Sequence, residues 1–146
     1  MPNDQARATT PEDLGRLFVE RANAGDIDGL VALYEPRAVL ALPDGRRATG
    51  AEEIREIYTM LLEDRPQFVA GEQRTALHNG NLALTSTRRG RGATAEVARR
   101  QPDGTWLQAG RHPGRAWFEV DVPAGEPSRW LTFFGTRVLE WWDAAR

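Results

Sequence analysis

Apolar residues recur at helical spacing in three stretches of the first half of the chain. The first stretch begins at Pro11, with Thr10 as the N-cap and Asp13 three positions later as a variant capping box. The second begins after Asp26, and the third covers residues 51–62. Each stretch has one apolar stripe and therefore predicts an amphipathic helix. The stripes consist of Leu14, Leu17, Phe18, Arg21 and Ala22, then Ile27, Leu30, Val31 and Tyr34, and then Ile54, Ile57, Tyr58, Leu61 and Leu62.

Strands are predicted where the apolar period changes to two and turn residues separate the runs. A short apolar strand, residues 38–42, follows Glu35-Pro36, which ends the second helix because proline cannot continue it. The turn Pro43-Asp44-Gly45 leads into a polar edge strand at residues 46–49. Four longer strands are predicted after the third helix, at residues 68–77, 82–88, 93–100 and 105–109, with hairpin turns between them.

This order of elements predicts the fold class. Helices first and antiparallel hairpins afterwards indicate an α+β fold rather than a doubly wound parallel sheet. We expect a curved antiparallel sheet that wraps around the three N-terminal helices as a cone, with an apolar cavity inside, which is the usual form of a small-molecule site. The 146 residues suit a single domain, preceded by a flexible tail at residues 1–9.

Composition and charge exclude several classes of protein. The chain has no Cys, no apolar run that could span a membrane and no apolar core of a signal peptide, so we expect a cytoplasmic protein. Its net charge of −2 differs from the positive excess of nucleic-acid binders, so neither nucleic acid nor a membrane is an expected partner. All 19 basic residues are Arg, which excludes lysine Schiff-base chemistry and is associated with GC-rich bacterial genomes. Two His without Cys make no metal-ligand pattern, so we expect no metal and no cofactor.

Four segments of the chain resemble the nuclear-transport-factor-2-like superfamily. They are residues 18–34, residues 36–58, the hairpin His78-Asn79-Gly80-Asn81 and residues 96–106, and together they cover roughly residues 10–110. Within the superfamily, the chain is similar to the ketosteroid isomerases and the SnoaL-like polyketide cyclases. The resemblance implies the α+β cone with its internal pocket. It specifies the fold better than the function, because this fold hosts many unrelated activities.

The resemblance also implies a catalytic pattern, from which this chain departs at two positions. Ketosteroid isomerase chemistry needs a carboxylate base at the end of the first strand and hydrogen-bond donors for the enolate oxygen. Leu42 stands where the base is expected, and Phe18 stands where a donor tyrosine is expected. Neither side chain can move a proton, so we predict no isomerisation of a β,γ-unsaturated ketosteroid. We expect both residues to line the pocket as substrate contacts.

Three polar residues match the family pattern. The resemblance places Glu96 at the acid donor, Tyr58 at a pocket tyrosine of the third helix and Tyr34 at a supporting tyrosine. We predict Glu96 as the catalytic acid/base, Tyr58 as the catalytic oxyanion donor and Tyr34 as a substrate contact. The alternative for both tyrosines is a core ring whose hydroxyl has one partner. The alternative for Glu96 is an outward carboxylate paired with Arg99 or Arg100.

Strand alternation extends the predicted site. If Glu96 faces the cavity, an apolar surrounding favours the protonated form of its carboxyl. An inward Arg88 would pair with Glu96 or bind a ligand carboxylate, whereas the alternative is an outward Arg88 beside Arg89. The further substrate contacts that we predict are Leu62 on the third helix, Leu84, Ser86 and Arg88 on the cavity face of one strand, and Thr94 beside Glu96 on the next.

Other polar residues have turn or loop interpretations beside their functional ones. Asp44 is the carboxylate nearest to the position of the missing base, but Asp in Pro-Asp-Gly is favoured by turn geometry alone. His78 begins a hairpin turn and is expected to be exposed. We place His112 among the substrate contacts at the cavity mouth, with a surface loop as the alternative. The arginine-rich residues 88–91 are typical of a solvated hairpin tip.

Residues 113–146 form an atypical C-terminal segment, because members of the superfamily that the chain resembles end shortly after the strand that contains Trp106. The segment could be helical or extended, and it could cap the cone or pack against a second subunit. We predict that truncation after His112 gives an aggregating or unfolded product, because so much aromatic surface must be buried. The aromatic residues concerned are Trp117, Phe118, Trp130, Phe133, Phe134, Trp141 and Trp142.

Two functions are compatible with these observations. The first is a SnoaL-like cyclase or isomerase that acts on a small hydrophobic carbonyl compound by acid/base catalysis. The second is a non-catalytic ligand-binding or dimerisation module that uses the same cavity. In both cases we expect a homodimer formed through the sheet. The direction in which Glu96 points discriminates between them.

Overall fold

The structure is a computed structural model that describes residues 6–89 and 92–114. The chain divides into two units, residues 1–114 and residues 115–146. Almost all of the predicted C-terminal segment therefore lies outside the described residues. Within the predicted tail, Ala8 is buried, and its carbonyl oxygen accepts a hydrogen bond of 2.9 Å from the backbone N–H of Trp106.

The described residues form three α-helices close to where the pattern predicts them. They are α1 (Asp13–Asn23), α2 (Ile27–Val31) and α3 (Gly50–Leu61). The predicted stripe of the first helix is confirmed, because its five residues are the buried residues of α1. At α2, the Asp26 carboxylate accepts a hydrogen bond of 2.8 Å from the backbone N–H of Gly29, which is the predicted N-cap contact.

The strands form one curved, mixed sheet rather than the antiparallel sheet that the sequence predicts. The described part of this sheet has the strand order β2-β1-β7-β6-β5-β3, with β4 also paired to β5. All pairs in the described sheet are antiparallel except β1 with β7, which run parallel. The strands are β1 (Tyr34–Ala41), β2 (Arg47–Thr49), β3 (Glu72–Gln73), β4 (Leu77–Asn79), β5 (Leu82–Arg89), β6 (Gly92–Arg100) and β7 (Trp106–Gly114).

Three predicted boundaries are wrong, and tertiary contacts explain them. The strand predicted at residues 105–109 continues to Gly114 as β7, because its residues beyond Ala109 pair with β1 and β6. The second helix ends at Val31 instead of Glu35, because Tyr34 pairs with Gln108 of β7 and so begins β1. Residues 68–77 do not form one long strand. The Phe68 backbone exchanges two hydrogen bonds, of 2.7 and 2.9 Å, with the side chain of Asn23 at the end of α1 instead of with a neighbouring strand.

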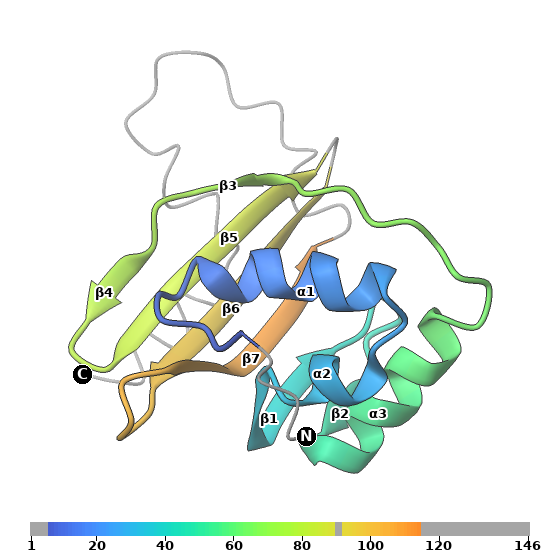
Figure 1. Cartoon of the computed structure of the whole chain (residues 1–146), viewed down its shortest axis with the longest axis horizontal. Coiled ribbons are helices and arrows are strands. Elements are labelled where there is room, and N and C mark those ends of the chain that lie inside the picture. Colours follow the sequence, from blue (N-terminus) through green and yellow to red (C-terminus); the bar gives the residue numbers. More distant parts are fainter. Residues whose placement is uncertain (1–5, 90–91, 115–146) are drawn as a thin grey trace. The chain divides into compact units, whose positions relative to one another are not determined.

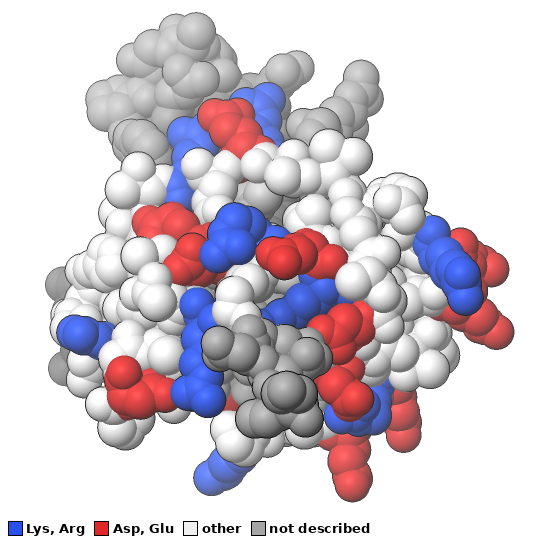
Figure 2. Space-filling model, viewed as in Figure 1, with Lys and Arg blue, Asp and Glu red and all other residues white. Residues whose placement is uncertain are grey.

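The helices and the sheet enclose the core from two sides (Figure 1). Helix α1 packs against β7 across the concave face of the sheet, and α3 packs against β1 and β2 at its edge. The face seen in Figure 2 carries basic and acidic side chains interspersed, and on α1 Arg16 pairs with Asp13 at 3.1 Å and with Glu20 at 3.4 Å. No helix in the described ranges is long and apolar enough to cross a membrane.

Candidate functional site

A cavity of about 680 Å³ lies between the inner face of the sheet and helices α1 and α3. Much of its wall is apolar, which suits a small hydrophobic ligand. Phe18 of α1 and Phe68 of the following loop contact each other edge to face, with ring centroids 5.6 Å apart. The apolar lining includes Phe18, Leu40, Leu42, Ile57, Leu61 and Phe68.

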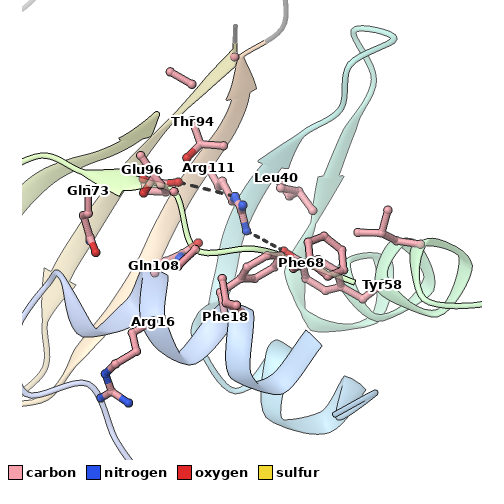
Figure 3. Close-up of a pocket in the computed structure, with 18 of the residues that line it drawn as sticks. Arg16, Phe18, Leu40, Tyr58, Phe68, Gln73, Thr94, Glu96, Gln108 and Arg111 are labelled. Carbon is pink, nitrogen blue, oxygen red and sulfur yellow. Dashed lines mark hydrogen bonds and ion pairs between the residues drawn. The ribbon is translucent and has the colours of Figure 1, made fainter. Parts of the chain in front are cut away.

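Three polar side chains, two from the sheet and one from α3, form a row in this cavity (Figure 3). Arg111 of β7 lies between the other two: its Nε atom is 3.7 Å from Glu96 Oε1, and its Nη1 atom donates to Tyr58 Oη at 3.5 Å. The Arg111 guanidinium also lies over the Phe18 ring, 4.1 Å from the centroid, which is a cation–π contact. The row therefore places a cation between a carboxylate and a phenol inside an apolar cavity.

Glu96 points into the cavity and is buried, with 6% of its surface exposed. Its Oε2 atom accepts a hydrogen bond of 3.0 Å from the hydroxyl of Thr85, its neighbour across the β5–β6 ladder. The alternative of an outward Glu96 paired with Arg99 or Arg100 is wrong, because Glu96 is buried and lines the cavity. Arg99 pairs instead with Glu35 at 3.0 Å. The carboxylate thus has one hydroxyl donor and one nearby cation, as a buried charge requires.

Tyr58 lies at the other end of the row, beside Tyr34. Both rings are buried, and their hydroxyl oxygens are 2.5 Å apart in a shared hydrogen bond. Burial and the neighbouring Tyr34 raise the pKa of the Tyr58 hydroxyl well above its ordinary value. Tyr58 is therefore a neutral hydroxyl that can donate a hydrogen bond to a ligand oxygen.

Arg111 keeps its charge although only 15% of its side chain is exposed. Burial by itself lowers the pKa of a guanidinium, but the nearby Tyr34, Tyr58 and Glu96 together raise the pKa of Arg111. A permanent cation at this point can stabilise negative charge that develops on a ligand oxygen.

Comparison with known proteins identifies the family of the chain. The family model described as SnoaL-like domain matches residues 16–125, which is more than half of the chain. The chain belongs to the SnoaL-like domain family. No curated protein matches it.

Solved structures show that the SnoaL-like domain has the nuclear-transport-factor-2-like fold. A ketosteroid isomerase-like protein from Erwinia carotovora atroseptica shares 20% identity at a TM-score of 0.56, over 68% of this chain and 88% of that chain. An NTF2-like protein with a cystatin-like fold from Novosphingobium aromaticivorans shares 17% identity at a TM-score of 0.59, over 82% and 84% of the two chains. A protein of unknown function from Mycobacterium tuberculosis shares 17% identity at a TM-score of 0.62, over 77% and 79%.

The structure brings five of the predicted site residues of this SnoaL-like domain to the cavity wall. They come from α1, the end of β1, α3 and β6, and are Phe18, Leu42, Tyr58, Thr94 and Glu96. Tyr34 is not among the lining residues and reaches the site through its hydrogen bond to Tyr58. Leu62 is buried in the hydrophobic core without lining the cavity.

The prediction of which face of β5 lines the cavity is wrong. The register pairs Thr85 with Glu96 and Thr87 with Thr94, so the threonines face the cavity side and the residues between them face the other side. Leu84, Ser86 and Arg88 do not line the cavity, and Arg88 is exposed. The arginine beside Glu96 is Arg111 instead of Arg88.

The remaining candidates lie away from the cavity. His112 pairs with Ala95 on β6, one position from Glu96, and is exposed, so it is no cavity contact. Asp44 stabilises the turn, as its alternative interpretation predicts. It accepts hydrogen bonds from the backbone and side chain of Arg46, which lower the pKa of its carboxyl. His78 is exposed and contacts the Trp106 ring edge to face, with centroids 5.7 Å apart.

Sequence reasoning missed Arg111 and Gln108, both of which line the cavity from β7. These residues are three positions apart, and regular alternation would send them to opposite faces of a strand. The ladder shifts register at this point, since Ala98 pairs with Gln108 but Val97 pairs with Gly110. Ala109 is thus an extra residue, a β-bulge that turns Gln108 and Arg111 to the same face. No local signal in the sequence reveals such a bulge.

Proposed function

We propose that this SnoaL-like domain binds a small, largely apolar carbonyl compound in the cavity and transfers a proton on it. The observation that carries the proposal is the row of Glu96, Arg111 and Tyr58 on the wall of a largely apolar cavity. A base, a fixed cation and a neutral hydroxyl are the groups that proton abstraction beside a carbonyl requires.

Each residue of the row has a distinct role in this reaction. The Glu96 carboxylate takes a proton from the carbon beside the carbonyl, and the electron pair of that C–H bond moves to form an enolate. Arg111 and the Tyr58 hydroxyl stabilise the negative charge on the enolate oxygen. When Tyr34 donates the hydrogen bond that the two tyrosines share, the Tyr58 hydrogen is free to point at the ligand. Glu96 then returns its proton to the same or another carbon, which regenerates the carbonyl.

The test follows proton exchange on a ketone probe. We use 2-tetralone in D2O and measure by NMR the exchange of its hydrogens beside the carbonyl, with the native protein and with Glu96→Gln. We expect Glu96→Gln to slow the catalysed exchange by about 100-fold or more, the usual contribution of a general base. Glu63→Gln, an exposed carboxylate outside the cavity, is the matched control and is expected to exchange like the native protein. Exchange that Glu96→Gln leaves unchanged would contradict the proposal.

A second candidate function, non-catalytic ligand binding, is favoured by one observation. Leu42 lines the cavity at the place where the resemblance puts the family base, so the usual carboxylate is missing. For the same reason we expect no isomerisation of a β,γ-unsaturated ketosteroid by the native protein. Binding of 2-tetralone without any catalysed exchange would support the binding module over the enzyme.

A further inference from the structure

Gln108 carries a buried acceptor that the fold does not use. Only 3% of its surface is exposed, and its side chain lines the cavity. Its Oε1 atom has no hydrogen-bond partner within residues 6–89 and 92–114. Buried side-chain oxygens in folded proteins almost always have a partner, so this one requires an explanation.

The other buried polar groups on the same face of the sheet are satisfied within the fold. The Thr85 hydroxyl donates to Glu96, and Glu96 in turn lies beside Arg111. Gln108 differs from them although it pairs with Ala98 of β6, which is only two positions from Glu96. The bulge at Ala109 turns its amide to the cavity side, where Figure 3 shows it with Arg111 and Glu96.

We propose that Gln108 Oε1 is a second recognition point for the ligand, which therefore carries a hydroxyl or N–H donor in addition to its carbonyl. This inference rests on the proposed function, in which Tyr58 and Arg111 hold the carbonyl oxygen. A ligand with such a donor completes the hydrogen bonding of Gln108, whereas a ligand without one leaves a buried acceptor unsatisfied, which is unfavourable. Gln108 thus selects hydroxylated or amino-substituted ketones over unsubstituted ones.

The first experiment compares matched probes. Dissociation constants are measured by calorimetry for 2-tetralone and for its four monohydroxy derivatives, isomers of one another with the hydroxyl at different positions of the aromatic ring, which place the donor at different points of the cavity. We expect at least one isomer to bind the native protein about tenfold more tightly than 2-tetralone, the gain of one hydrogen bond. In Gln108→Leu that ratio of affinities falls to about one. A ratio of one for every isomer in the native protein, or a ratio that Gln108→Leu preserves, overturns the inference.

The second experiment needs no ligand and compares two substitutions by their unfolding midpoints. Gln108→Leu removes an acceptor without a partner, so the midpoint is expected to stay the same or rise. Thr85→Val is the matched control, because Thr85 is equally buried but donates to Glu96, and its midpoint is expected to fall. A fall for Gln108→Leu as large as for Thr85→Val would show that Gln108 serves the fold, and would overturn the inference.

The two proposals fail in different ways. If no ketone binds the native protein, or if Tyr58→Phe leaves 2-tetralone affinity unchanged, the proposed function is contradicted, and the midpoint comparison alone then decides whether Gln108 is a structural residue. If 2-tetralone binds in a Tyr58-dependent way but no hydroxyl isomer gains affinity, only the inference about Gln108 is contradicted.

Discussion

Tyr58 stays neutral across the physiological range, because burial and the neighbouring Tyr34 raise the pKa of its hydroxyl well above its ordinary value. Tyr58 also lines the cavity, and its hydroxyl shares a hydrogen bond of 2.5 Å with Tyr34. A single residue therefore serves both the core and the site. Its two roles can be separated by measuring stability and ligand binding in the same variants.

We expect Tyr58→Phe to lower the free energy of unfolding by about 1–3 kcal/mol at neutral pH, because the buried Tyr34 hydroxyl loses its partner. Tyr34→Phe, which does not alter the cavity wall, is the matched control. Its stability is expected to fall by a similar amount. Only Tyr58→Phe is expected to weaken 2-tetralone binding, as calorimetry would measure. Equal affinities in both variants would exclude Tyr58 as a ligand contact.

The raised pKa of Tyr58 also predicts that the free energy of unfolding depends on pH. Above about pH 10 the unfolded chain releases the tyrosine proton while the folded protein keeps it, so the native protein loses stability as the pH rises. The loss attributable to Tyr58 is about 1.4 kcal/mol per pH unit. It is absent in Tyr58→Phe. Denaturant unfolding of both proteins from about pH 9 to pH 11 measures the difference, and parallel curves would refute the prediction.

Among the elements, α1 shows how a local sequence pattern determines a helix start. The hydrogen bonds of the predicted capping box are present: Asp13 N–H donates to the Thr10 hydroxyl at 3.3 Å, and the Asp13 carboxylate accepts from the backbone N–H groups of Thr10 at 3.1 Å and Thr9 at 2.9 Å. Helix α1 itself begins at Asp13, with Glu12 instead of the predicted Thr10 at the N-cap. Partial burial by itself would raise the pKa of Asp13, but these donors and Arg16 lower it to about 2.

This lowered pKa predicts how the stability of the helix start depends on pH. A carboxyl group whose pKa is lower in the folded state stabilises the protein above the unfolded pKa of about 4, and that contribution is lost as the pH falls toward 2. We expect Asp13→Asn to lower the free energy of unfolding by about 1 kcal/mol at neutral pH and to converge with the native protein near pH 2. The exposed Asp64→Asn is the control and is expected to match the native protein throughout. If the free energy of unfolding of Asp13→Asn stayed below that of the native protein by a constant amount down to pH 2, the ionised Asp13 carboxylate would not be the source of the stabilisation.

At the scale of the whole molecule, the core described by the structure is built from helices and strands between Ala8 and Trp106. The predicted burial of the aromatic residues beyond Gly114 lies outside the described residues and stays a prediction. So does the homodimer formed through the sheet. Both predictions concern contacts between the described residues and something other than the described residues themselves.

Two truncations test whether the C-terminal segment is needed for folding. A chain that ends at His112 loses the β7 residues Pro113 and Gly114, which pair with Thr94 and Ala93, whereas a chain that ends at Gly114 keeps them. We expect both to aggregate or to melt without cooperativity, because burial of each large aromatic side chain contributes roughly 1.5–3 kcal/mol. Calorimetry and gel filtration measure the outcome. A soluble, cooperatively melting chain that ends at Gly114 would show that the segment is dispensable.

The sequence by itself determined where each helix lies, the turns and the α+β class, because these depend on residues close together in the chain, and its resemblance indicated the family. The stripe of α1, the caps at Asp13 and Asp26 and the turn at Asp44 are local patterns, and the structure confirms each of them. Glu96 and Tyr58 could be singled out because the resemblance assigned them pocket positions.

Only the tertiary structure decided which side chains of the strands face the cavity. The predicted β5 face was wrong by one residue, since the partner strand sets the register and a shift of one position reverses every side chain. Arg111 and Gln108 reach the cavity together because of a bulge opposite β6, and β1 runs parallel to β7, a strand more than sixty positions later in the chain. Such pairings join residues that are distant in the sequence, so no local pattern encodes them.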